Sequence, residues 1–201
     1  MVDNAKIGER TRKRAGKNHD SLSGPERNLN SAIIKEMELQ CDLALKGFDE
    51  LEKALSECDD EKVWYSIHSF FSSAARISEL LKLGEKAIEK NRENDDLRKL
   101  MKISNSSLLS NPKWGRAIGD FGEKLEEWAT KTDRTHIGEK NVIPKGCVSE
   151  MDEEDMLRHF DPETYEFTLR GETYDLKKCQ EKISEVKDVI EDLARKSFWD
   201  I

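Results

Sequence analysis

Residues 63–81 read VWYSIHSFFSSAARISELL, and their apolar positions decide the predicted fold class. Apolar residues recur in this stretch at alternating steps of three and four, namely at Val63, Ile67, Phe70, Ala74, Ile77 and Leu81. That spacing places the side chains on one face of an α-helix, and such a face becomes stable only by packing on another apolar face. The stretch therefore predicts one helix of a bundle.

Three further stretches repeat this spacing. They are Ile34, Met37, Cys41, Ala44, Phe48, Leu51 and Leu55; Trp114, Ile118, Phe121, Leu125 and Trp128; and Leu176, Cys179, Ile183, Val186, Ile190 and Leu193. Counting a short helix near 97–103, the sequence predicts a mainly α protein, a four- to five-helix bundle. Asp59-Asp60 and Asp175 stand where two of the helices should be capped, and Asn28 or Asn30 where the first should begin.

A small antiparallel β-hairpin is expected before the last helix, at about residues 157–175. Apolar and polar residues alternate there around two turn segments, Asp161-Pro162-Glu163-Thr164 and Arg170-Gly171-Glu172. Such a hairpin is marginally stable alone, so it should lie against the helices. A loop with Gly138, Pro144 and Gly146 is expected after about Thr132, and the acidic run at 149–155 is expected to be a solvated loop or the start of a helix. We accordingly predict a single helical-bundle domain over residues 29–201.

Residues 1–28 differ from the rest of the chain in charge. They hold seven Lys/Arg and four Asp/Glu, a net charge of +3, although the whole protein carries −8. The segment has no aromatic residue and no periodicity, which is typical of a disordered tail. We expect residues 1–28 to form a solvated terminus. The alternative is contact with nucleic acid through Arg10, Arg12, Lys13 and Arg14.

The composition excludes several classes of protein. No apolar run approaches the ~20 residues that cross a membrane, and the N-terminus has no apolar core of a secretory signal. The four cysteines form no CxxC pair, so a reduced, cytoplasmic protein is expected. No phosphate loop, zinc motif or Glu-x-x-His pair is present. We expect no cofactor and no metal site.

A few polar and small residues stand close to the predicted apolar faces. His68 is expected at the boundary of the bundle rather than as a ligand. Arg76 is expected to pair with a carboxylate of a neighbouring helix, and the sharper alternative is an inward charge that binds an anion or RNA. Two groups of small residues predict tight helix contacts. They are Gly115, Gly119 and Gly122, and the residues Ser66, Ser69, Ser72, Ser73, Ala74, Ala75 and Ser78.

Three segments resemble a group of bacterial helical proteins related to the HEPN superfamily. The segments are WYSIHSFFSSAARIS at 64–78, FGEKLEEW at 121–128 and LRHFDPET at 157–164, of which Arg-His-Phe-Asp-Pro-Glu-Thr is the most distinctive part. The resemblance covers roughly residues 30–195. It implies a four- or five-helix bundle, frequent dimerisation and, in active members, RNA cleavage without a metal ion.

The active HEPN motif is an arginine followed four to six residues later by a histidine. The arginine would hold the scissile phosphate while the histidine moves a proton. This chain offers Arg116, but Asp120, Phe121 and Gly122 follow at the spacing of the histidine. Other catalytic candidates are His68 and His136, and Arg116 and Arg76 are the candidates for anion or RNA binding. The neighbouring pairs Arg134/His136 and Arg158/His159 do not have the motif's spacing.

The sequence thus favours a HEPN-like module that is not catalytic and that self-associates or binds a partner protein. The resemblance alone implies a bacterial or phage setting. Aromatic and apolar residues beyond the four stripes are the expected contact points, with packing against the hairpin as the alternative; they are Trp64, Phe71, Phe198, Trp199 and Ile201. A metal-independent endoribonuclease using Arg116, and nucleic-acid binding through the tail, remain the alternative functions.

Overall fold

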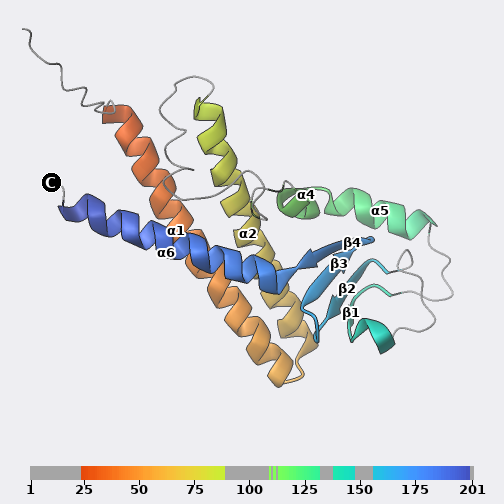
Figure 1. Cartoon of the computed structure of the whole chain (residues 1–201). Helices are drawn as coiled ribbons and strands as arrows, with labels where there is room; N and C mark the ends of the chain where they lie inside the picture. The colour runs from red at the N-terminus through yellow and green to blue at the C-terminus, as the bar shows by residue number, and fades with distance from the viewer. Residues whose placement is uncertain are drawn as a thin grey trace, which may run out of the picture.

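The computed structural model describes residues 24–88, 109, 111, 113–131, 138–147 and 156–199. The described chain is mainly helical, with a small sheet before the last helix, as the sequence predicts (Figure 1). The helices are α1 (Gly24–Ser56), α2 (Asp60–Ile88), α4 (Lys113–Gly119), α5 (Phe121–Lys131) and α6 (Leu176–Trp199), with a 3₁₀ turn, η2 (Lys145–Cys147). The strands are β1 (Asn141–Val142), β2 (Arg158–Asp161), β3 (Glu166–Leu169) and β4 (Glu172–Asp175). The predicted tail up to residue 23 and the short helix at 97–103 lie outside the described residues.

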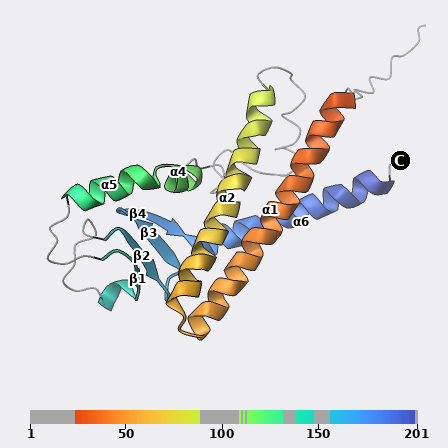
Figure 2. The same ribbon diagram turned by 180° about the vertical axis from the view of Figure 1, so that it is seen from behind.

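Helices α1 and α2 form an antiparallel pair that lies side by side in both views (Figures 1 and 2). α1 begins at Gly24, four residues before the earlier of the two predicted starts, Asn28 and Asn30, so residues 24–28 are helical although they were expected in the tail. Pro25 is suited to a first helical turn. Its end is a Schellman turn in which Cys58 adopts φ 53° and the Asp59 amide donates to the carbonyl oxygen of Ala54 at 3.0 Å. The Asp59 carboxylate then accepts from the Lys62 amide at 3.1 Å, which confirms the predicted cap of α2.

The close approach of α1 to α2 occurs at Gly47. A Cβ atom on Gly47 would lie 3.1 Å from the backbone nitrogen of Phe70 and 3.5 Å from Ser69 Oγ, so the predicted tight helix contact is present at Ser69. The same expectation for Gly115, Gly119 and Gly122 is wrong. Among the described residues, a Cβ atom at any of these three positions would meet nothing within 4 Å, so that part of the structure holds no tight contact there.

Three of the four apolar stripes are buried as predicted, in α1, α2 and α6. The third stripe is not a bundle face. A turn at Asp120 divides the predicted helix into α4 and α5, and α5 has no buried residue. α5 lies beside β4 in both views and is tied to the sheet by ion pairs, Lys124 to Glu172 at 3.2 Å and Arg170 to Glu127 at 4.0 Å (Figures 1 and 2). Trp114 of α4 is fully buried, whereas Leu125 of α5 is exposed.

The sheet has the strand order β1-β2-β3-β4 and extends beyond the predicted hairpin. Strands β2, β3 and β4 pair antiparallel, and Arg170 (φ 48°) with Gly171 (φ 76°) forms the tight turn between the last two, as predicted. β1 pairs parallel to β2 inside the segment expected to be a loop. The buried carboxylate of Asp161 holds that segment in place, since it accepts a hydrogen bond from the Lys145 amide at 3.0 Å.

One face of the sheet carries a row of aromatic side chains that packs on the helices. The register aligns Phe160 with Phe167 and Phe167 with Tyr174, and all three are buried. The ring of Phe71 on α2 lies 5.0 Å from that of Phe167 and 4.9 Å from that of Tyr174. Trp64 also meets Phe167 edge-on, at 6.1 Å. Trp64 and Phe71 are therefore buried, so their role as exposed contact points is wrong and the alternative, packing against the hairpin, is correct.

Helix α6 follows directly from β4 and crosses α1 (Figures 1 and 2). The Asp175 carboxylate accepts from the Lys178 amide at 2.9 Å, so the predicted cap of this helix is present. Lys187 of α6 pairs with Asp42 of α1 at 2.6 Å. The helix ends at Trp199, and the side chains of Phe198, Trp199 and Ile201 lie outside the described residues.

The contact at Gly47 gives a test with a matched control. Gly47→Ala should lower the free energy of unfolding by ~1–3 kcal/mol, because the added methyl group overlaps the backbone of Phe70. Gly115→Ala, which meets no neighbour, should raise it by ~0.5–1 kcal/mol through the better helix propensity of alanine. Urea denaturation measures both, and a stabilised Gly47→Ala variant would contradict the close approach.

Candidate functional site

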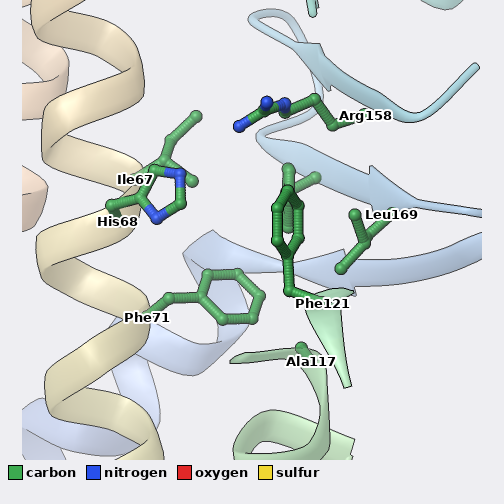
Figure 3. Close-up of a pocket in the computed structure, with 8 residues that line it drawn as sticks. Ile67, His68, Phe71, Ala117, Phe121, Arg158 and Leu169 are labelled. Atoms are coloured by element: carbon green, nitrogen blue, oxygen red, sulfur yellow. The ribbon is translucent and has the colours of Figure 1, made fainter. Parts of the chain in front are cut away.

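A pocket of about 180 Å³ lies between α2, the α4–α5 segment and the sheet (Figure 3). Six of its eight lining residues are apolar, and the other two, His68 and Arg158, can carry positive charge. The lining residues are Ile67, His68, Phe71, Ala117, Phe121, Arg158, Phe167 and Leu169. In the close-up, His68 projects from α2 and Arg158 from the sheet on the opposite side (Figure 3). We call these two residues the rim.

Helix and strand periodicity together bring these residues to one place. Ile67 and Phe71 are four residues apart on α2, and Ala117 and Phe121 are four apart across the α4–α5 turn, so each pair shares a side of its segment. In the sheet, the register pairs Arg158 of β2 directly with Leu169 of β3. Both side chains therefore project from the same face of the sheet as the aromatic row.

Arg158 is held firmly at the rim. Its guanidinium carbon lies 5.7 Å from the ring centre of Trp64 and 5.4 Å from that of Phe121, so two aromatic faces attract the cation. Nε donates to the backbone oxygen of Glu139 at 3.3 Å, and Nη2 lies 3.6 Å from the Glu139 carboxylate. Only 18% of the Arg158 side chain is exposed, whereas 64% of Glu139 is exposed. The charge of Arg158 is thus positioned by its surroundings and only partly neutralised.

His68 is a neutral group beside this cation. Its partial burial in the pocket wall lowers the pKa of the imidazole below its ordinary value of 6.5, and the charge of Arg158 lowers it further. His68 is therefore neutral at pH 7 and can either donate or accept one hydrogen bond. Because the folded state binds this proton less readily than the unfolded chain, stability falls as the pH drops from about 6.5 through the lowered pKa.

The dimensions and lining of the pocket suit a small apolar group with one polar end. An apolar cavity of about 150 Å³ in another protein binds benzene, so a pocket of this size accepts one ring or one branched side chain. The polar groups stand only at the rim, which would fix the orientation of whatever enters. The described lining residues include no serine, threonine or cysteine.

Neither of the predicted anion-binding residues, Arg76 and Arg116, lines the pocket. Arg76 is exposed on α2 and pairs with Glu79 of its own helix at 2.9 Å, rather than with a carboxylate of another helix. Arg116 is exposed on α4 and does not line the pocket, although its neighbour Ala117 does. Its charge acts weakly on β4: it adds to the lowering of the pKa of Glu172, which the hydrogen bond from Tyr174 dominates, and it opposes the rise in the pKa of Tyr174 that burial causes. Of the two catalytic candidates in the described part of the chain, His68 lines the pocket and Arg116 does not.

Several predicted residues lie outside the described part of the chain. They are His136 and the tail residues Arg10, Arg12, Lys13 and Arg14. Among the residues that are described, no group of three or more His, Cys, Asp or Glu side chains could hold a metal ion. Nor does any described helix combine the length and the apolar character needed to span a bilayer.

Sequence reasoning missed Arg158 as a site residue. It lies in the Arg-His-Phe-Asp-Pro-Glu-Thr segment, which was singled out for its resemblance and not for a role. The usable sign was strand alternation: Arg158 shares a face with the buried Phe160, so it had to project toward the helices. The other residues that line the pocket with Arg158 come from elements that include α2, α5 and β3. No local sequence pattern predicts that these elements meet Arg158.

Comparison with known proteins returns no match, neither of the sequence with protein-family models or curated proteins nor of the fold with solved structures.

The electrostatic coupling across the rim can be measured by titration. In an NMR titration, the pKa of His68 should lie below 6.5 and should rise in Arg158→Gln, because one of its two causes is removed. The rise should be incomplete, since burial remains. Arg116→Gln removes the same charge outside the pocket and should leave the pKa of His68 unchanged. An equal pKa in wild type and Arg158→Gln would mean that the two side chains do not face each other.

Proposed function

We propose that this protein is a non-catalytic interaction module of HEPN-like type that binds a partner protein through the pocket. The observation that carries the proposal is the pocket itself: a largely apolar hollow of about 180 Å³ with charge-bearing groups only at its rim. Buried apolar anchors that fill such pockets supply most of the energy in protein–protein recognition. One apolar side chain of the partner would be the anchor.

The rigidity of the walls supports this function. Phe71 and Phe167 line the pocket, and their rings also pack on each other, 5.0 Å apart, where α2 meets the sheet. Arg158 is fixed between two rings. A binding site whose walls are already ordered avoids part of the entropic cost of association.

The placement of the candidate residues favours binding over catalysis. An arginine that holds a scissile phosphate and a histidine that moves the proton must reach the same phosphodiester. His68 lies in the pocket, whereas the charge of Arg116 acts on Glu172 and Tyr174 of β4. The mainly helical architecture is compatible with the HEPN resemblance, which we keep as part of the proposal.

Peptide selection tests the proposal directly. A library of random displayed peptides is selected on the purified protein, and the selected peptides are then measured against two variants that narrow the pocket, Ala117→Leu and His68→Trp. His68 is exposed, so the second variant should fold even if the first does not. We expect peptide affinity to fall at least ~10-fold in each folded variant, because the anchor loses its space.

Tyr65→Ser is the matched control for this experiment. Tyr65 is an α2 aromatic residue that is 73% exposed and does not line the pocket, so its loss should leave peptide affinity unchanged. Peptides that bind equally well to the narrowed variants would overturn the proposed site. Cleavage of mixed RNA in EDTA by the wild type, lost in Arg116→Ala, would overturn the non-catalytic assignment.

A further inference from the structure

The rim offers a cation at the mouth of an apolar pocket. Among contacts within the described part of the chain, the hydrogen bond and ion pair with Glu139 engage Nε and Nη2 of Arg158, and none engages Nη1. The Nη2 contact is long, at 3.6 Å, and Glu139 is largely exposed. A carboxylate arriving at the rim can therefore compete with or join Glu139 at the guanidinium.

His68 faces the same opening from α2 (Figure 3). Among the described residues that line the pocket, His68 and Arg158 are the two that can be charged, and none is acidic. The nearest acidic group to Arg158 in the described structure is Glu139, which precedes β1 and lies outside the lining. An anion at the mouth would thus meet a fixed positive charge and a neutral hydrogen-bonding imidazole.

From this geometry we infer that the partner's docking segment is a peptide in which an aromatic or branched apolar side chain stands next to an aspartate or glutamate. The inference rests on the proposed function, because it names the chemistry of the ligand for that same pocket. The apolar side chain fills the space between Phe71, Phe121 and Leu169. The adjacent carboxylate pairs with Arg158 at the rim.

Size and charge select this ligand over others. A pocket of about 180 Å³ holds one side chain and not a long acyl chain, so a peptide fits better than a lipid. The protein carries a net charge of −8, which repels acidic polymers in general. Arg158 is a single cation on a protein of negative net charge, so it should attract a carboxylate only when an apolar side chain of the same ligand occupies the pocket. The protein would therefore distinguish this ligand from other acidic molecules.

Two blocked dipeptides that differ in one group test the inference. N-acetyl-Phe-Asp-amide carries the carboxylate, and N-acetyl-Phe-Asn-amide replaces it with an amide of the same shape. Binding is followed by NMR shifts of the pocket residues at millimolar peptide. The acidic peptide should bind ~10-fold more tightly to the wild type, and Arg158→Gln should remove that difference without weakening the amide. Arg116→Gln, an equal loss of charge outside the pocket, should preserve it.

A second readout needs only the wild-type protein, in case Arg158→Gln folds poorly. A bound carboxylate beside Arg158 adds negative charge near His68, so saturation with the acidic peptide should raise the pKa of His68, and the amide peptide should not. Tighter binding at low pH by the acidic peptide alone follows by linkage.

The outcomes separate the two proposals. Equal binding of both peptides at the pocket, with no change in the pKa of His68, overturns the acidic preference and leaves the pocket as an apolar docking site. Shifts confined to residues outside the pocket, or no binding by either peptide, contradict the proposed function as well. A preference for the acid that survives in folded Arg158→Gln assigns the carboxylate to another residue and also overturns the inference.

Discussion

The packing of Phe71 against the sheet is the interaction on which the rest of the structure depends. Its ring lies within about 5 Å of three others, those of Trp114 on α4, Phe167 on β3 and Tyr174 on β4. One side chain of α2 thus joins the helical pair to the sheet and to the α4 segment. Edge-to-face aromatic pairs add stability beyond the area they bury. Without this cluster, the short strands would have little apolar surface to rest on.

The same cluster creates the pocket. Phe71 and Phe167 both line it, and the sheet register that aligns Phe167 with Phe160 also pairs Leu169 with Arg158. The apolar lining and the cation at the rim therefore follow from one strand alignment. A one-residue shift in that alignment would turn Arg158 away from the helices. The architecture that stabilises the sheet and the proposed binding chemistry are consequently inseparable.

Local patterns predicted those parts of the protein that are locally determined. The stripes of α1, α2 and α6 and the caps at Asp59 and Asp175 depend on residues close in sequence, and they were predictable. Strand β1 could not be predicted, because a strand of two residues is too short to show alternation and because its partner, β2, is distant in the sequence. The stripe of α5 has helical spacing, but only its start follows the prediction: Phe121 packs against the core, whereas Leu125 is exposed. Of the candidate site residues, only His68 was placed in the pocket; Arg158 gained its role from tertiary neighbours.

A double-mutant cycle between Phe71 and Phe167 tests the central claim most directly. Free energies of unfolding are measured for Phe71→Leu, Phe167→Leu and the double variant, with Phe71→Leu and Ile190→Val as a control pair without a described ring contact. The account predicts a coupling of ~0.5–1.5 kcal/mol for the aromatic pair and additivity within ~0.5 kcal/mol for the control. Additive effects for Phe71 and Phe167 would contradict the claim that this contact joins the sheet to α2.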